Sequence, residues 1–145
     1  MPRQFDKFGI SFQYPDNWVV DGKEATAGKP TVTVYSPGGG FWSVSVHPPG
    51  TNPVRLARAA VRAMRQEYEG VEHASAREII AGRKLLGYDL NFFYLDLTNT
   101  AVVRCLRTTR ATYTFFYQAE DREFERIGPV FLAMTTSLVK NVGSE

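Results

Sequence analysis

Residues 8–18 read FGISFQYPDNW, and this stretch decides how the N-terminal part of the chain folds. Ile10, Phe12 and Tyr14 alternate with polar residues, which is the period of a half-buried β-strand. Pro15 ends the strand, because proline fixes φ and has no backbone N–H to donate. An Asp-Asn turn follows, and the apolar run that starts at Trp18 returns to the core. The stretch therefore predicts a strand, a tight corner and a buried tryptophan.

The same stretch resembles the start of PsbP-like domains, in which a glycine precedes the strand and Tyr-Pro-x-x-Trp ends it, as Gly9 and residues 14–18 do here. This group includes the extrinsic photosystem II subunit, the nuclear Ran-binding Mog proteins, the DcrB lipoproteins and bacterial families of unknown function, which the chain resembles most. The closing helix of the group is also similar to the end of this chain, at Phe124, Ile127, Phe131 and Leu138, with Ser137 before the leucine. The resemblance implies a three-layer helix-sheet-helix fold. It also implies a role in assisting assemblies or in binding partners. It carries no catalytic residues.

Two helices and several strands are predicted from the rest of the chain by its hydrophobic periods. The strand-like segments are residues 19–20, 31–36, 41–47, 77–81, 86–97, 101–108 and 112–118. One helix begins at Asn52-Pro53, an N-cap followed by proline at the first helical position, and runs to Glu69. The other begins near Asp121 and contains Gly128-Pro129, where we expect a kink or two abutting helices. These elements predict an α+β fold: a three-layer helix-sheet-helix sandwich around a mainly antiparallel twisted sheet, in one domain spanning residues 1–145.

Residues 86–97 are apolar on both faces of the strand that they predict. Tyr88, Leu90, Phe92 and Tyr94 share one face, and Phe93, Leu95 and Leu97 share the other. We expect this strand to be covered on both sides, and we expect the chain to turn at residues 98–100.

Composition and charge exclude several classes of protein. The 145 residues carry 17 basic and 15 acidic side chains, a net charge of +2, which lacks the basic excess of a general nucleic-acid binder. No apolar run is long enough to span a bilayer. The single cysteine allows no intrachain disulfide. The first residues contain no signal peptide, so we expect a cytoplasmic protein, or one whose leader has been removed.

The residue types that carry chemistry do not fall into catalytic or metal-binding patterns. Gly22 to Lys29 departs from a phosphate-binding loop, because five residues separate its glycines and Pro30 occupies the hydroxyl position. His47 and His73 have no metal-ligand spacing to other residues. Cys105 shares its strand face with apolar Val103, which indicates a buried structural thiol. We therefore expect no cofactor, no metal and no enzymatic activity.

Four arginines give the sharpest functional signal: Arg55, Arg58, Arg62 and Arg65. Their spacing of three, four and three places them on one flank of the first predicted helix. Only Arg65 has an acid four residues later, Glu69, and like charges at these spacings repel. A solvated helix face is the ordinary explanation. The first functional alternative is that these arginines bind an acidic protein partner. The second is that they bind a phosphate-bearing or anionic-lipid surface.

Trp42 lies in a predicted hairpin, next to Phe41. Adjacent strand residues point to opposite faces, so one of these two aromatic rings is exposed unless a helix covers it. Trp42 is therefore a candidate binding residue, with burial under a helix as the alternative.

The function that these observations favour is a non-enzymatic protein-interaction or accessory domain that binds a partner through its surface. The alternative is a small-molecule or lipid-binding module, with a pocket lined by the aromatic residues of segments 86–97 and 112–118. The sequence leaves the oligomeric state open.

The corner at Pro15 can be tested through Trp18. Replacing Trp18 with Ala should lower the free energy of unfolding by about 3–5 kcal/mol, as for other large aromatic side chains removed from cores. Chemical denaturation measures this loss. An unfolding midpoint equal to that of the unchanged protein would contradict the burial of Trp18.

Overall fold

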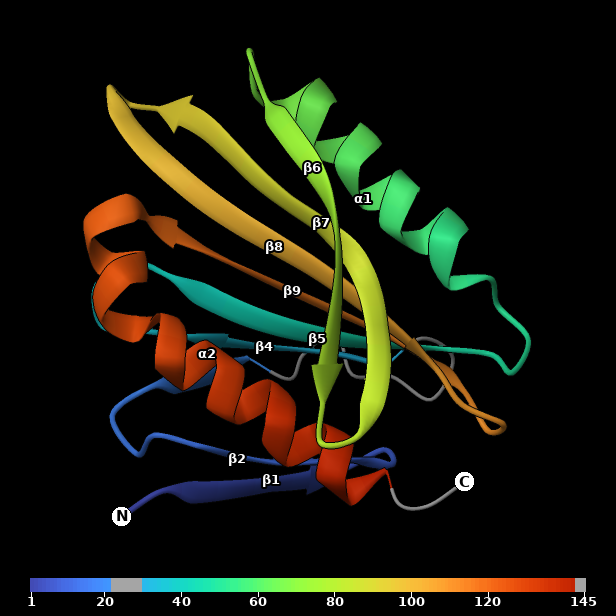
Figure 1. Ribbon diagram of the computed structural model, residues 1–145. Helices are drawn as coiled ribbons and strands as arrows, with labels where there is room; N and C mark the ends of the chain where they lie inside the picture. Colours follow the sequence, from blue (N-terminus) through green and yellow to red (C-terminus); the bar gives the residue numbers. More distant parts are fainter. Residues whose placement is uncertain (22–29, 143–145) are drawn as a thin grey trace.

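The computed structural model describes residues 1–21 and 30–142 (Figure 1). Its strands are β1 (Arg3–Lys7), β2 (Ile10–Tyr14), β3 (Val19–Asp21), β4 (Thr31–Tyr35), β5 (Phe41–His47), β6 (Glu72–Ile80), β7 (Arg83–Tyr94), β8 (Leu97–Arg107) and β9 (Thr112–Glu120). Its helices are α1 (Pro53–Glu67) and α2 (Asp121–Asn141). The segment that contains the rejected phosphate-loop pattern, residues 22–29, lies outside the described residues.

The strands form one large and one small antiparallel sheet. The large sheet has the order β3-β4-β5-β9-β8-β7-β6, and β1 pairs with β2 in a separate two-stranded sheet. Every neighbouring pair is antiparallel, from β3 with β4 to β8 with β9. The long connection is the one from β5 through α1, β6, β7 and β8 to β9, which returns to lie beside β5 (Figure 1).

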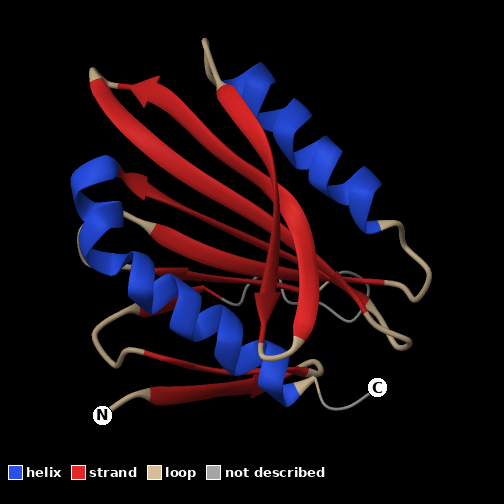
Figure 2. Ribbon diagram, viewed as in Figure 1, coloured by secondary structure: helices blue, strands red, loops and turns tan. Residues whose placement is uncertain are grey.

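Two hydrophobic cores lie on the two faces of the large sheet. On one face, α1 packs over β7 and β8 through a small cluster that contains Ala57, Val61, Met64, Leu90 and Phe92. On the other, α2 and the β1–β2 hairpin cover a larger cluster. Figure 2 shows the two helices separated by the sheet. The predicted α+β class and the three-layer arrangement are confirmed, with the β1–β2 hairpin as an addition to the α2 layer.

The larger core is built from aromatic rings. Trp42 is fully buried, with its ring centroid 4.7 Å from that of Phe12 and 6.1 Å from that of Phe115. Trp18 is buried as predicted and meets Phe131 of α2 edge-on at 5.7 Å. The corner after Tyr14 closes with a hydrogen bond from the Trp18 N–H to the Pro15 carbonyl.

Both helices begin at capping side chains. Asn52 Oδ1 accepts from the N–H groups of Val54 and Arg55, as the Asn-Pro start predicts. The Glu120 carboxylate caps α2 in the same way. Pro129 lies inside α2, which continues through it as one helix, so the prediction of two abutting helices is wrong. In the described residues, neither helix is long and apolar enough to cross a membrane.

The segment predicted as one strand over residues 86–97 is two strands and a turn. Leu95 and Asp96 form a two-residue turn with φ of 52° and 63°, and Tyr94 pairs across it with Leu97. The sequence predicted the turn at residues 98–100, and the observed turn lies before them. The prediction missed it because leucine is not a residue type that indicates a turn. The expected two-sided burial also fails here, since Phe93 is 68% exposed and Leu95 is 77% exposed.

β6 starts five residues earlier than predicted, at Glu72. Its first residues, Glu72 to Ser75, are all exposed, so they lack the apolar alternation that marks a strand in the sequence. A turn at Ala81 and Gly82 connects β6 to β7, with φ of 49° and 79°. This two-residue turn fixes the register of the β6–β7 pair, in which Ile80 faces Arg83.

A buried carboxylate joins the β4–β5 turn to the start of α2. Glu123 Oε1 accepts hydrogen bonds from Ser36 Oγ at 3.0 Å and from the Gly40 N–H at 2.6 Å. A Cβ atom at Gly38 would overlap the same carboxylate, so a larger residue there would displace Glu123 from these hydrogen bonds.

Replacing Glu123 with Ala should lower the free energy of unfolding by about 1–3 kcal/mol, because the buried Ser36 hydroxyl loses its acceptor and the Gly40 N–H keeps only Ser36 Oγ. Urea denaturation measures the loss. Glu125→Ala removes an exposed acid from the same helical turn and serves as the control. Equal losses in the two variants would mean that helix charge, and not the buried hydrogen bonds, accounts for the effect.

Candidate functional site

The four arginines lie on the outer flank of α1, and all four side chains are exposed. The buried residues of the same helix are Ala57, Val61 and Met64, which hold its other side against β7 and β8. Within α1, Glu67 is the single acidic residue against four arginines. We call this row, Arg55, Arg58, Arg62 and Arg65, the arginine stripe.

The arginine stripe makes no ion pair with any of residues 1–21 and 30–142. Two acids near the start of α2 have other contacts. Glu120 pairs with Arg122, and Glu123 is buried against Ser36 and Gly40. Within the described ranges, nothing therefore occupies the guanidinium groups of the stripe.

Arg104 shows the contrasting arrangement of a structural arginine. It is buried on the α2 face of the sheet, and its guanidinium donates to Glu78 Oε1 and to Asp89 Oδ1, each at 2.8 Å. Burial opposes the charge, but the hydrogen bonds to Glu78 and Asp89 outweigh it and raise the pKa of Arg104 above its ordinary value. Arg104 lies on the face opposite Cys105, and no spacing in the sequence predicts its ion pairs.

A shallow groove of about 310 Å³ lies between α1 and β6. Its floor is formed by residues 86–88 of β7, and its walls by Val54 and Ala57 of α1 and by Ser75, Ala76 and Arg77 of β6. Ser75, whose small side chain lies on the α1 face of β6, leaves room for the groove beside Arg77. Gly87 is needed for another reason, because a Cβ atom there would overlap the backbone of Val103. Sequence reasoning missed the groove, since β6 was predicted to begin at Arg77.

An exposed apolar patch forms the tip of the β7–β8 hairpin. Its residues are Phe93, Tyr94, Leu95 and Leu97. The patch adjoins the end of α1, because Tyr68 stacks on Phe92 at 4.4 Å and meets Tyr94 edge-on at 5.5 Å. Exposed apolar residues gathered at one place are typical of a protein-contact surface.

The candidate binding residue Trp42 is not on the surface. Its ring is fully buried under α2, and its Nε1–H donates to Thr135 Oγ1 at 2.9 Å. The prediction of Trp42 as a surface contact is therefore wrong, because α2 covers that face of the hairpin. Phe41, on the other face, is half-buried and stacks on Phe116.

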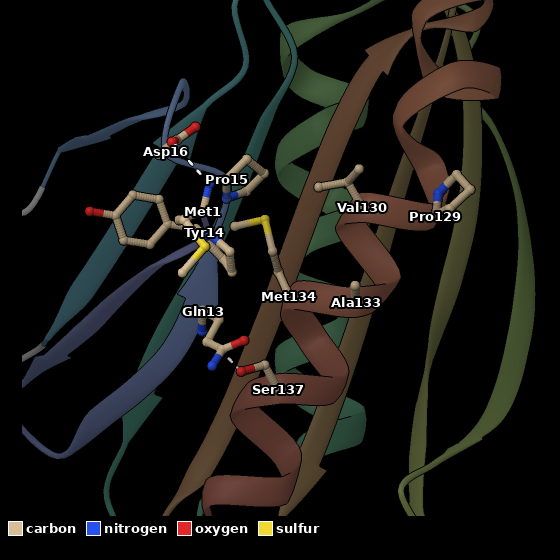
Figure 3. A pocket seen from close by; sticks show the side chains of 11 residues that line it. Met1, Gln13, Tyr14, Pro15, Asp16, Pro129, Val130, Ala133, Met134 and Ser137 are labelled. Atoms are coloured by element: carbon tan, nitrogen blue, oxygen red, sulfur yellow. Dashed lines mark hydrogen bonds and ion pairs between the residues drawn. The ribbon is translucent and has the colours of Figure 1, made fainter.

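The aromatic residues expected to line a ligand pocket are packed together instead. Phe115 and Tyr117 of β9 are buried, and Tyr117 contacts Phe131 with ring centroids 5.0 Å apart. An apolar groove of about 450 Å³ lies elsewhere, between β2 and α2 (Figure 3). There Met134 points from α2 toward Met1 and Pro15.

The described residues contain no group of three or more side chains that could hold a metal ion. Cys105 is buried beneath α1, and burial raises the pKa of its thiol from 9.0 to about 11. The thiol contacts Thr114 Oγ1 at 3.7 Å. The predicted buried structural thiol is confirmed.

Comparison with solved structures finds similar folds. Cyanobacterial PsbP (CyanoP) from Synechocystis sp. PCC 6803 matches with a TM-score of 0.61 and 14% identity, over 94% of this chain and 89% of that one. PA94, a protein of unknown function from Pseudomonas aeruginosa, matches with a TM-score of 0.55 and 9% identity, over 94% and 95%. A protein from Bacteroides thetaiotaomicron VPI-5482 gives a TM-score of 0.51 and 16% identity, over 81% of this chain and 41% of that one. No protein-family model and no curated protein matches the sequence.

Cys105 should react slowly with a thiol reagent such as iodoacetamide in the folded protein. At pH 8 its raised pKa makes the thiolate fraction about a hundredfold smaller than for an ordinary thiol, and burial slows access further. The measurement is labelling followed by mass spectrometry, with the denatured chain as reference. Equal rates in the two states would contradict the burial of this residue.

The same thiol should make stability depend on alkaline pH. Because the folded-state pKa is raised, the contribution of Cys105 is complete below 9.0 and is lost as pH rises through about 11. The free energy of unfolding should therefore fall over this range. A Cys105→Ala variant should lack this part of the fall, and an unchanged fall would assign it to other groups.

Proposed function

We propose that this chain, a protein with a PsbP-like fold, is a non-enzymatic accessory domain that binds an acidic partner protein through the arginine stripe of α1. The observation that carries the proposal is the exposed, unpaired state of Arg55, Arg58, Arg62 and Arg65 in the described part of the chain. Like charges at these spacings cost stability. A partner that supplies carboxylates would remove this repulsion.

The charge distribution favours a protein partner over nucleic acid. The whole chain carries 17 basic and 15 acidic side chains, a net charge of +2, so it lacks the overall basic excess of a general nucleic-acid binder. The apolar tip of the β7–β8 hairpin lies next to the end of α1 and supplies the kind of surface that proteins bury on association. An acidic protein with apolar residues beside its carboxylates fits both features.

The chemistry of the interior supports a binding role over catalysis. The one thiol is buried with a raised pKa, which disfavours the nucleophilic thiolate. The buried charged groups Arg104 and Glu123 are held by structural partners. The groove between β2 and α2 is mainly apolar, and the charged groups in its lining, the Met1 amino group and Asp16, pair with each other.

The test replaces Arg58 and Arg62 together with Gln and measures binding of a fluorescent poly-glutamate peptide at low and at moderate salt. The unchanged protein should bind the peptide, more weakly as salt rises, and the double variant should bind less and depend less on salt. Its free energy of unfolding should change by less than about 0.5 kcal/mol.

The control variant carries Arg126→Gln and Lys140→Gln, which remove two exposed cations from α2 and give the same change in net charge. Equal weakening by the two double variants would refute a site on α1 and would leave only non-specific attraction. A large loss of stability in the Arg58 and Arg62 variant would mean that these side chains have structural partners.

A further inference from the structure

β6 is an open edge of the large sheet. In the described residues its one neighbour is β7, and β6 is nine residues long, whereas the opposite edge strand, β3, has three. Natural proteins often protect long edges with proline, lysine or a covering segment. β6 contains neither proline nor lysine, and most of its residues are exposed.

The register shows which backbone groups of β6 are unpaired. The two-residue turn at Ala81 and Gly82 closes with the hydrogen-bonded pair Ile80 and Arg83. Bonded and non-bonded pairs then alternate along an antiparallel ladder. The residues whose N–H and C=O groups point away from β7 are therefore His73, Ser75, Arg77 and Ile79. These four present a regular row of donors and acceptors at the edge.

The arginine stripe lies on the side of α1 that faces this edge. At 100° per residue from Ala57, Val54 lies at about 60° and the four arginines at about 80–160°. Val54 lines the groove with Ser75, Ala76 and Arg77 of β6, so this flank is the one next to β6. Leu56 and Ala60 occupy the other flank and pack against the buried cluster beneath α1.

We propose that an extended, acidic segment of the partner protein pairs with β6 as an additional strand, between the β6 edge and the arginine stripe. This inference rests on the proposed function and specifies how the partner is held. The backbone of the segment bonds to the outward groups of β6, which supplies affinity without regard to sequence. Its alternate side chains point to the α1 side of the sheet, where carboxylates meet the guanidinium groups.

The groove also accommodates apolar residues of such a segment. Val54, which lines the groove, is 38% exposed, and Ile79, two residues beyond Arg77 on the same face of β6, is 71% exposed. The small side chains of Ser75 and Ala76 leave room for a strand to approach. The segment that fits best therefore combines carboxylates with β-branched residues, which also favour the extended conformation.

A second copy of the chain fits this edge less well than an acidic partner. Pairing of two β6 strands across a two-fold axis would place two arginine stripes on one sheet, one beside each strand. Their repulsion opposes such a dimer, whereas a carboxylate-bearing strand is attracted.

The experiment uses a short peptide that alternates glutamate and valine, added to the ¹⁵N-labelled protein. We expect the amide protons of His73, Ser75, Arg77 and Ile79 to become protected from hydrogen exchange. The intervening amides of β6 already pair with β7 and should change little. A peptide N-methylated along its bonding edge should bind at least about tenfold more weakly, because it lacks the donors. Methylation along the other edge should be tolerated.

A variant of β6 tests the same edge from the side of the protein. Ser75→Pro removes one outward N–H, at a position where an edge strand tolerates proline, and should weaken binding of the peptide. Ser75→Ala keeps the N–H and should not. The N-methylated peptides give the answer even where Ser75→Pro disturbs folding.

The outcomes separate this inference from the proposed function. Binding that needs Arg58 and Arg62, but does not protect β6 and tolerates both methylated peptides, overturns strand addition and retains docking on the stripe. Protection of β6 that is insensitive to Arg58 and Arg62 overturns the role of the stripe. Protection that rises with protein concentration without peptide identifies a second copy as the occupant, and absence of peptide binding overturns both proposals.

Discussion

The indole of Trp42 is the contact on which the arrangement of the α2 layer depends. It belongs to β5, yet it touches Phe12 of the small sheet and Phe115 of β9, and its N–H donates to Thr135 of α2. A buried indole N–H needs such an acceptor, so the position of α2 along the sheet is fixed by a polar contact within an apolar core. With α2 and the β1–β2 hairpin committed to one face, α1 is left as the thin cover of the other. The outer surface of α1 faces solvent, so it can carry the four arginines without burying a charge.

Much of the fold follows from the sequence, because its elements obey local rules. Asn52-Pro53 caps and starts α1, and the alternation around Phe12 gives β2. The misplaced boundaries have physical causes. Leu95, at the first position of the β7–β8 turn, is not a turn-forming residue type, so the sequence gives little sign of this turn. The first residues of β6 are exposed, so they lack the apolar alternation that marks a strand. Pro129 interrupts the sequence pattern of α2 but not the helix, whose packing against the sheet holds it together.

The candidate site was predictable in part. Helical spacing alone places Arg55, Arg58, Arg62 and Arg65 together, because it depends only on the period of one element. Whether these arginines form ion pairs depends on acidic residues elsewhere in the chain, and the spacing within α1 does not predict those contacts. Trp42 illustrates the same limit, since its exposure depends on a helix more than 90 residues later in the chain that covers it. The groove beside β6 also arises between elements, from the approach of Val54 to Ser75, and no single stretch encodes it.

The position of α2 in the chain order has a consequence for folding. The strands from β6 to β9 are joined by short turns and can associate with little loop-closure entropy. β5 instead pairs with β9 across a long intervening segment, and Phe12, Trp18 and Trp42 are covered only when α2 docks. During synthesis the ribosome releases these aromatic residues well before the helix that buries them. In the nascent chain this aromatic surface is therefore exposed until α2 emerges. A chaperone that binds the nascent chain would act during this interval.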